Sequence, residues 1–330
     1  MQKSLAEPQR ILIVTPAKRG SRGGNRTTAL RWAGLLRSSG HHVRVRTAWD
    51  GQGCDVLIAV HAAKTAAAVA EATAGRPQLQ VVVLLAGTDI YPTFADDPAT
   101  RAALLRADAL VALQPNALDL LPAEIRPRAT SIVQSATAAP AAGTTRADRF
   151  TVVMLAHIRP VKQQLVALEA LAAIPNHLDV RMVFAGGELD RDYSRRFRAA
   201  VAANPRATWI GECSRQDSKR LLAEAHLCLV PSSAEGGANV ISESLAAGTA
   251  IACSAIPGNL GLLGEDWPAQ FPAGNAHALA ELLQRIRTDR AFLDSLGART
   301  RALQPMVEPA AERAAWAALL ATLRSQPPRK

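Results

Sequence analysis

The amino-acid sequence predicts an α/β fold built from two doubly wound parallel sheets. Segments with strand-like and helix-like patterns alternate along the chain, as they do in repeated β–α–β units. Nearly continuous apolar runs such as Leu79–Leu85 are typical of strands that are buried on both faces of a parallel sheet. The alternation stops at residues 137–149, which are rich in Ala, Gly, Pro and Thr, and then starts again. We therefore expect a linker between two similar halves.

The first half contains alternating predicted strands and helices. Strands are expected at Arg10–Thr15, Val43–Thr47, Asp55–Val60, Leu79–Leu85, Ala109–Leu113 and Thr130–Val133. Helices are expected at Arg26–Ser38, Lys64–Ala74, Pro98–Arg106 and Ala117–Leu121. In the first helix, Leu30, Ala33 and Leu36 recur at helical spacing, and Gly40 follows as a stop signal.

The second half repeats the pattern. Strands are expected at Phe150–Leu155, Val180–Phe184, Thr208–Ile210, His226–Pro231 and Ala250–Cys253. Helices are expected at Val161–Ala173, Tyr193–Ala203, Gln216–Ala225, Ala276–Arg287, Arg290–Leu303 and Ala310–Arg324, with a further short helix that ends at Gly248.

Composition sets the class of protein. The chain has 330 residues, of which 48% are hydrophobic and 20% charged, which is typical of a globular protein with a large core. No apolar run approaches the roughly 18 residues that span a bilayer. The first residues lead into a strand without an apolar signal segment, so we expect a cytoplasmic protein. The four cysteines show no CxxC spacing, which argues against a zinc site or a disulfide framework.

Positive charge is concentrated at the start of the chain. The net charge is +10, and residues 1–46 contain ten Lys or Arg against a single acid, Glu7. One interpretation is a solvated basic face, and another is a nucleic-acid surface. Aromatic residues make up only 4% of the chain, and no helix-turn-helix, zinc-finger or RNA-binding motif is present. A small anionic ligand bound beyond the first strand explains the bias more economically.

The stretch from Glu235 to Gly248 is the strongest candidate for a ligand site. It follows the predicted strand His226–Pro231, begins with a Gly-rich turn and continues into a short helix. Backbone N–H groups and the helix dipole attract an anion at such a position. Glu243 is expected in the first helical turn, where its carboxylate suits sugar hydroxyls better than phosphate. The pattern predicts a site for a phosphorylated sugar or a nucleotide.

A second Gly-rich loop follows the first strand. Residues 20–28 resemble a P-loop, but Arg26 replaces its lysine and Asn25 replaces its second glycine, which argues against an NTPase. The turn at Gly23-Gly24 can bind an anion through backbone N–H groups. The alternative is an ordinary turn between a strand and a helix.

Polar residues follow several other predicted strands, where ligands bind in open α/β sheets. In the first half these are His61, Gly87-Thr88-Asp89 and Gln134-Ser135, although His61 alone could simply cap a helix. In the second half, Lys162 is expected near a helix N-terminus, where it could neutralise a diphosphate or be an ordinary surface lysine. The loops that contain Gly186-Gly187 and Gly211 to Cys213 could line the same pocket.

Residues 150–260 resemble the nucleotide-sugar domain of the family 4 glycosyltransferases, which have the GT-B fold. The E-x7-E motif of that family is matched by Glu235 and Glu243. The pairs Gly236-Gly237, Asn239-Val240 and Ala247-Gly248 also stand where the family has them.

The family's strand–glycine–arginine segment is altered in this chain. Leu155, Ala156 and His157 stand in its place, followed five residues on by Lys162. Because His157 replaces the arginine, either His157 or Arg159 must supply the second donor to a diphosphate.

The first half of the chain resembles a more specific group of enzymes within this family. The segments ILIVTPAKRGSRGGNRTTALRWAGLLRSSGHHVRV, WDGQ, DVLIAVHAAKTA and LAGTDIY, with the tip Gln134-Ser135-Ala136, are similar to the selenosugar synthases of selenoneine biosynthesis. These enzymes join selenophosphate to a UDP-sugar, typically UDP-N-acetylglucosamine, and form a carbon–selenium bond. The basic start of the chain suits a doubly charged acceptor of this kind.

The resemblance implies two Rossmann-like domains that face a cleft. It assigns the acceptor to residues 1–140 and the UDP-sugar to residues 150–305, and we expect the helix in residues 306–330 to pack back toward the first domain. Donor contacts are implied for His157, Arg159, Lys162, Gly211, Cys213, Glu235, Gly236, Gly237, Asn239, Val240 and Glu243. Acceptor contacts are implied for Lys18, Arg22, Gly23, Gly24, Asn25, Arg26, His61, Thr88, Asp89 and Gln134.

Catalytic roles are expected for Lys162, Glu235, His61 and Asp89. No metal and no other cofactor is expected, and the partners are the two small substrates, without nucleic acid or membrane. Two other classes stay open: a family 4 transferase with a hydroxyl acceptor, and a basic binding protein without enzymatic activity.

Overall fold

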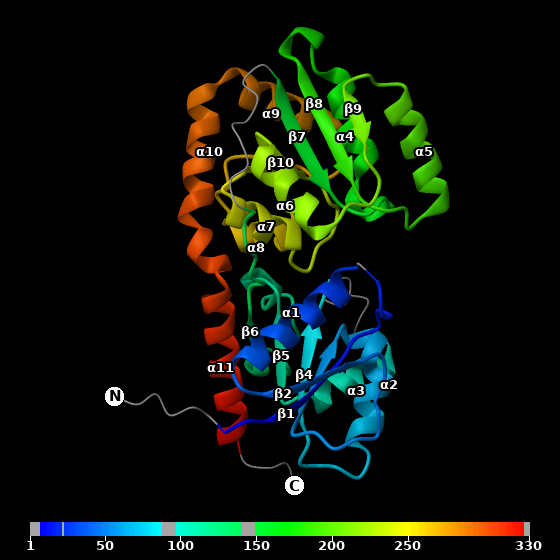
Figure 1. The fold of residues 1–330 in the computed structure, drawn as a ribbon, viewed down its shortest axis with the longest axis vertical. Helices are drawn as coiled ribbons and strands as arrows, with labels where there is room; N and C mark the ends of the chain where they lie inside the picture. Colours follow the sequence, from blue (N-terminus) through cyan, green and yellow to red (C-terminus); the bar gives the residue numbers. More distant parts are fainter. Residues whose placement is uncertain (1–6, 22, 88–96, 140–148, 327–330) are drawn as a thin grey trace. The chain divides into compact units, whose positions relative to one another are not determined.

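The computed structural model describes residues 7–21, 23–87, 97–139 and 149–326. The chain forms two compact units, each organised around a parallel sheet (Figure 1). Unit 1 combines residues 1–134 with residues 309–330, and unit 2 consists of residues 135–308. The last helix of the chain therefore belongs to the same unit as the first strand.

The sheet of unit 1 has six strands, all parallel. They are β1 (Arg10–Val14), β2 (His42–Arg46), β3 (Val56–Val60), β4 (Gln80–Leu85), β5 (Ala109–Ala112) and β6 (Ala129–Ser131). Their spatial order is β2-β1-β3-β4-β5-β6. The chain first moves to one side of β1 and then crosses to the other side, so the order reverses between β1 and β3.

Helices cover both faces of this sheet. Ile11 and Ile13 of β1 face a core that includes α1 (Gly24–Ser38) and α11 (Pro309–Ser325). Leu12 and Val14 face the opposite core, with α2 (Ala62–Thr73) and α3 (Pro98–Arg106). The alternation follows from strand geometry, since successive side chains point to opposite faces. The prediction of a doubly wound sheet is confirmed for this half.

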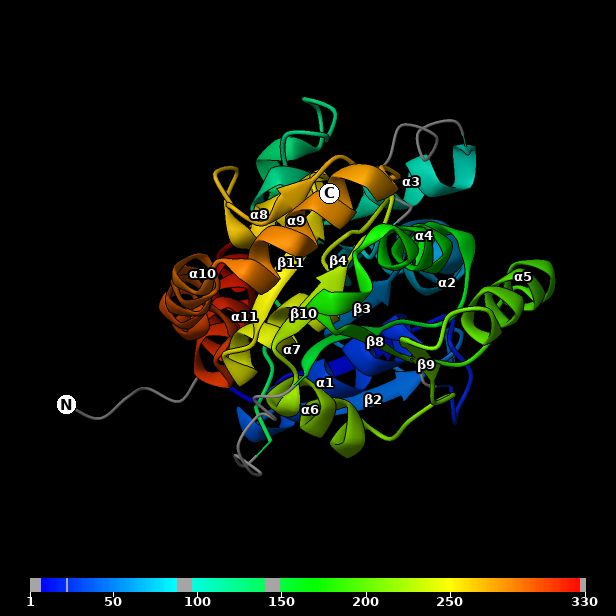
Figure 2. The same cartoon turned by 90° about the horizontal axis from the view of Figure 1, so that it is seen from above.

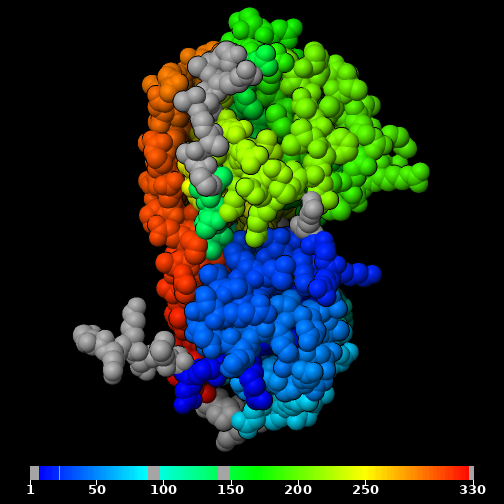
Figure 3. Space-filling model, in the orientation of Figure 1, coloured from blue at the N-terminus to red at the C-terminus, as the bar shows by residue number. Residues whose placement is uncertain are grey.

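The helix α11 completes the core of unit 1. The rings of Trp32 in α1 and Trp316 in α11 pack edge to face with centroids 4.6 Å apart. Trp32 Nε1 also donates a 2.7 Å hydrogen bond to the carboxylate of Glu312, which is only 2% exposed. Arg31 forms an ion pair with the same carboxylate. In the space-filling view the red atoms of α11 lie directly beside blue atoms of unit 1 (Figure 3), in agreement with the contacts between α11 and α1.

The sheet of unit 2 also has six parallel strands. They are β7 (Phe150–Leu155), β8 (Val180–Ala185), β9 (Ala207–Trp209), β10 (Leu227–Val230), β11 (Ala250–Ser254) and β12 (Gln270–Phe271). The spatial order β12-β11-β10-β7-β8-β9 is that of a Rossmann-like sheet, with the reversal between β7 and β10.

The helices of unit 2 pack in two groups. One consists of α4 (Gln164–Ala173), α5 (Arg191–Ala202) and α9 (Ala276–Thr288), and the other of α6 (Arg215–Glu224), α7 (Asn239–Ala247) and α10 (Arg290–Ala302). The helix α5 lies beside the edge strand β9 (Figure 2). Among the helices that the structure describes, none combines the length and the apolar character needed to cross a membrane.

Four local predictions were wrong or incomplete. Residues 117–121 do not form a helix, because a 3-10 turn at Pro115–Ala117 replaces it and Pro122 disfavours helical backbone at Leu121. The helix expected from Val161 begins only at Gln164. The short helix α8 (Pro257–Leu263) and the two-residue strand β12 were not predicted, since both are too short to show a period.

Candidate functional site

The strand order of each unit points to a ligand site at one end of its sheet. In open α/β sheets, ligands bind outside the carboxyl ends of the strands at the point where the strand order reverses. In unit 2 this point lies between β7 and β10. The residues that follow these two strands, 156–163 and 231–239, contain most of the predicted donor residues.

An ion pair joins these two loops in unit 2. Lys162 Nζ donates a hydrogen bond to Glu235 Oε1, and both side chains are largely buried, with 17% and 10% of their surfaces exposed. Ser232 Oγ donates to the same Glu235 oxygen at 2.6 Å. The backbone N–H of Ser233 donates to the carbonyl of Val161 at 2.9 Å, which ties the two loops together a second time. An ammonium group has three N–H donors, so Lys162 can hold Glu235 and an anionic ligand at once.

Lys162 is not at the start of the helix as the sequence predicted. It ends a short 3-10 turn, Pro160–Lys162, and Gln163 follows with φ of 58°, which is left-handed backbone. This kink breaks the expected continuous helix, because the α-helix begins only at the next residue. The lysine therefore reaches Glu235 from a turn and not from the first turn of α4.

His157 is held in one orientation by its neighbours. Its Nδ1 accepts a 3.1 Å hydrogen bond from the N–H of Gly187. A ring nitrogen that accepts carries no proton, so the proton of this imidazole lies on Nε2 and can be donated to a ligand. Gly186 has φ of 155°, and a Cβ there would stand 2.0 Å from the carbonyl oxygen of Ala156, so only glycine fits. By contrast, Arg159 is exposed and has no side-chain partner among the described residues.

The helix α7 confirms most of the prediction for the stretch from Glu235 to Gly248. It spans Asn239–Ala247 and ends at Gly248, whose φ of 74° is left-handed. Ala238 precedes it and makes no side-chain cap, and its first turn holds no acid. Glu243 was predicted in that first turn, but it is the fifth residue of the helix and lies one turn further on. The difference arises because the helix starts at Asn239, after the glycine turn.

Gly211 and Cys213 follow β9, at the edge of the sheet. The carbonyl of Gly211 accepts a 2.8 Å hydrogen bond from the N–H of Gly186, which connects this loop to the segment that holds His157. Cys213 Sγ lies 3.1 Å from Ser218 Oγ in a hydrogen bond within its own loop and helix α6. Gly211 therefore supports the region around His157.

In unit 1 the strand order reverses between β1 and β3, and His61 directly follows β3. Its backbone has φ of 79° and ψ of 100°, a strained combination for a residue other than glycine. The side chain is buried, and the backbone N–H donates to the carbonyl of Leu84 at 3.0 Å. Such strain persists only where the surroundings impose it, and it occurs preferentially at functional positions.

The N-terminus of α1 lies beyond β1, on the other side of the same reversal. Gly23 precedes the helix without a side-chain cap, and the first turn holds no acid but contains Asn25 and Arg26. Arg26 Nε is buried and has no acceptor among the described residues, whereas Lys18 is exposed. The predicted acceptor residues Arg22, Thr88 and Asp89 lie outside the described residues.

Gln134 contacts α1 and is not an exposed tip. Its Nε2 donates a 2.6 Å hydrogen bond to Thr28 Oγ1, and both side chains are 3% exposed. Its Oε1 is buried without a donor among the described residues. Thr28 was not among the predicted site residues, although its place two residues after Arg26 in a predicted helix was a usable signal.

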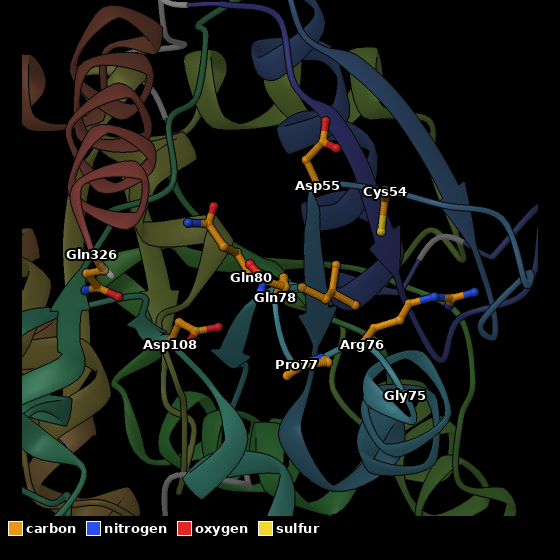
Figure 4. A pocket seen from close by; sticks show the side chains of 10 residues that line it. Cys54, Asp55, Gly75, Arg76, Pro77, Gln78, Gln80, Asp108 and Gln326 are labelled. Atoms are coloured by element: carbon orange, nitrogen blue, oxygen red, sulfur yellow. The ribbon is translucent and has the colours of Figure 1, made fainter. Parts of the chain in front are cut away.

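A hollow of about 620 Å³ lies in unit 1, at the end of the sheet opposite to the carboxyl ends of the strands (Figure 4). It is lined by residues at the amino ends of β3, β4 and β5, among them Asp55, Gln80 and Asp108. These side chains already bond to the protein: Asp55 to Arg10, Gln80 to the carbonyl of Leu323 and Asp108 to the N–H of Val81. Burial raises the pKa of Cys54 in this hollow to about 11, so the thiol is protonated at neutral pH. The hollow is therefore not the candidate site.

The comparisons with solved structures identify the fold. Sucrose-phosphate synthase from Thermosynechococcus elongatus matches with a TM-score of 0.81 and 17% identity over 96% of this chain and 99% of its own. HepE from Anabaena, in complex with UDP and glucose, matches with a TM-score of 0.77 and 16% identity over 95% and 100%. A glycosyltransferase from Rickettsia africae matches with a TM-score of 0.77 and 14% identity over 97% and 100%. The chain has the GT-B fold of these proteins.

The comparison with family models identifies the family. No curated protein sequence matches the chain. Residues 137–303, just over half of the chain, match the model described as Glycosyl transferases group 1. This segment contains both loops of the unit 2 site, including Lys162, Glu235 and Glu243. The chain therefore belongs to the group 1 glycosyltransferases.

Proposed function

We propose that this glycosyltransferase transfers a sugar, by preference N-acetylglucosamine, from a UDP-sugar to selenophosphate. The products are a selenosugar with a carbon–selenium bond, UDP and phosphate, as in selenoneine biosynthesis. Unit 2 binds the UDP-sugar in this proposal, and unit 1 binds the acceptor. Neither a metal nor another cofactor is invoked.

The donor half of the proposal rests on the site in unit 2. Lys162 supplies positive charge to the diphosphate, and either His157 Nε2 or the Arg159 guanidinium supplies the second donor. The N-terminus of α7 is uncapped by any side chain and offers backbone N–H groups to the same phosphates. Glu243 binds the ribose hydroxyls and Glu235 the sugar. The structures of HepE with UDP and glucose and with UDP-glucose support this class of donor.

The acceptor half is carried by a single observation, the basic and acid-free N-terminus of α1. The first turn of this helix holds Arg26 and no carboxylate, and Lys18 lies in the loop before it. A helix N-terminus and a half-buried guanidinium suit a phosphoryl group with two negative charges. Asn25, Gly23 and Gly24 would add amide donors, and Arg22, Thr88 and Asp89 stay proposed acceptor residues.

The chemistry requires one substitution and one hydrolysis. The selenium anion of selenophosphate attacks C1 of the sugar, and the bond between C1 and the β-phosphate oxygen breaks, with its electron pair leaving on UDP. Water then cleaves the phosphorus–selenium bond, so that phosphate departs and selenium keeps the electron pair and takes a proton. An anionic nucleophile needs little general-base help. The enzyme contributes positioning and stabilises the charge that develops on UDP.

A hydroxyl acceptor is the second candidate, and one observation favours it. A hydroxyl nucleophile needs a base, and the imidazole of His61 lies at the end of β3 in unit 1. In that case His61, rather than the charge of Arg26, would dominate acceptor use.

The test is to incubate the protein with UDP-N-acetylglucosamine and selenophosphate, phosphate or thiophosphate in parallel, and to measure UDP release. We expect turnover with selenophosphate, weaker turnover with thiophosphate and none with phosphate. Binding of UDP without UDP release in the selenophosphate reaction would contradict the selenophosphate proposal and leave the family assignment intact. Salt-sensitive binding of mixed DNA would instead support the non-enzymatic alternative.

A further inference from the structure

The backbone of Glu235 lies directly against the start of α8. A Cβ added at Gly258, the second residue of this helix, would stand 2.0 Å from the carbonyl oxygen of Glu235 and 2.8 Å from its Cβ. Real Cβ atoms do not approach other atoms this closely. Because φ at Gly258 is not positive, the restriction comes from this contact alone. The glycine therefore fixes how close α8 comes to Glu235.

A chain of buried hydrogen bonds leads from the next residue of α8 to the Glu235 carboxylate. Asn259 Nδ2 donates to the backbone oxygen of Ser254 at 3.1 Å and to its Oγ at 3.0 Å. Ser254 Oγ donates to the carbonyl of Ser232, and Ser232 Oγ donates to Glu235 Oε1 at 2.6 Å. Asn259 and Ser254 are fully buried and Ser232 is 1% exposed, so water does not compete for these bonds.

The chain of bonds connects two neighbouring strands at their carboxyl ends, where the candidate ligand site lies. Ser254 ends β11, and Ser232 follows β10, its partner in the sheet. The loop that carries Glu235 leaves the sheet at this point. Buried hydrogen bonds of this kind hold their partners in one arrangement, because losing any one of them leaves a further buried polar group unpaired.

We propose that Gly258 and Asn259 are positioning residues for Glu235. Gly258 sets the place of its backbone, and Asn259 acts through Ser254 and Ser232 on the carboxylate that Lys162 contacts from the other loop. The role in catalysis rests on the proposed function, in which Glu235 orients the donor sugar. A displacement of about 1 Å at such a group is expected to lower kcat on the order of 100-fold.

The first test is Gly258→Ala in the full chain. We expect kcat for UDP release from UDP-N-acetylglucosamine to fall about 100-fold. The Kd of UDP should change less than about twofold, because the proposed nucleotide contacts of Glu243 and α7 are not moved. The matched control is Gly297→Ala in α10, another helical glycine of unit 2, whose Cβ would meet only the flexible end of Arg301. It should leave both quantities unchanged.

Ser254→Ala provides a second variant that does not depend on Gly258→Ala folding. It removes one hydroxyl from the chain of bonds, and we expect a smaller fall in kcat, about tenfold, again without loss of UDP affinity. Each variant is then combined with Glu235→Gln. If the residues act through Glu235, they have little further effect in that background.

If Gly258→Ala and Ser254→Ala lower kcat by the same factor with and without Glu235→Gln, the positioning role is overturned. A loss of UDP affinity that parallels the fall in kcat would overturn it as well. A wild-type chain that binds no UDP would overturn the proposed function itself, which the titration with UDP reveals before any variant is made.

Discussion

The two points where strand order reverses are built differently in unit 1 and unit 2. In unit 2 the loops after β7 and β10 are joined by the Lys162–Glu235 ion pair and by the backbone bond from Ser233 to Val161. In unit 1 the corresponding region combines a strained His61 with a helix N-terminus that has no cap and no acid in its first turn.

The two candidate sites would therefore bind a ligand in different ways. In unit 2 the charges of Lys162 and Glu235 balance each other, and a buried chain of hydrogen bonds keeps Glu235 in place. A ligand there finds groups that are already oriented. In unit 1 the first turn of α1 carries Arg26 and no acid, and the Nε of Arg26 has no acceptor among the described residues, so its positive charge is available to attract an anion. Changes in unit 2 should therefore affect kcat, and changes in unit 1 should affect acceptor binding.

The largest effect is expected for Lys162→Ala. This change removes the cation proposed to stabilise departing UDP and leaves Glu235, with only 10% of its side chain exposed, without its ion-pair partner. We expect kcat to fall about 100- to 1,000-fold, the usual loss when one electrostatic contact to the transition state is removed. Steady-state measurement of UDP release provides the value.

The control for this prediction is Lys64→Ala, because Lys64 is an exposed lysine on α2. It should behave as the wild-type protein does. A decrease of less than about threefold for Lys162→Ala would mean that the ion pair is structural, and the contrast between the two units would lose its functional meaning.

An intermediate effect is expected for Arg26→Ala in unit 1. Because a hydrogen bond to a charged group contributes about 1.5 to 3 kcal/mol, the KM for selenophosphate should rise roughly 10- to 100-fold. The Kd of UDP, measured by calorimetric titration, should stay within about twofold of the wild-type value. Arg196→Ala on the exposed face of α5 removes the same charge elsewhere and should change neither quantity. If the KM for selenophosphate and the Kd for UDP rise by similar factors, the effect of Arg26 is not specific to acceptor binding.

The fold could be predicted from the sequence because its signals are local and repeated. Apolar runs such as Leu79–Leu85 indicate strands buried on both faces, and the periodic helices between them leave few other architectures. Short elements escaped this reasoning. The helix α8 contains two glycines and a proline in seven residues, so its helical state depends on contacts with the rest of unit 2.

The candidate site could be predicted where its residues follow one another along the chain, and not where it depends on packing between distant residues. A strand followed by glycines and a helix indicated the stretch from Glu235 to Gly248. The pairing of Lys162 with Glu235 joins residues 73 positions apart, and no spacing indicates it. Gly258 and Asn259 could not be found for the same reason, since their importance lies in distances to Glu235 and Ser254. The left-handed backbone at Gln163 and the strain at His61 are likewise imposed by tertiary structure.

The smallest effect concerns that strain and is read from a matched pair, His61→Gly and His61→Ala. Both changes delete the imidazole, so both should lower transfer activity equally if His61 contacts the acceptor. They differ in backbone freedom, because glycine adopts φ of 79° without the steric penalty that alanine bears there. Strain of this kind amounts to about 1 to 3 kcal/mol, so the glycine variant should be the more stable one by roughly 1 kcal/mol in chemical denaturation.

The neighbouring residue provides the opposite control for that comparison. Ala63 is exposed in the first turn of α2, where the backbone is helical, and Ala63→Gly should therefore destabilise the chain by about 0.5 to 1 kcal/mol. Glycine would then stabilise relative to alanine at position 61 and destabilise at position 63. The same order at both positions would show that His61 is not strained. The contrast between the two units would then rest on charge and on the pairing of the loops, and not on backbone strain imposed at the site of unit 1.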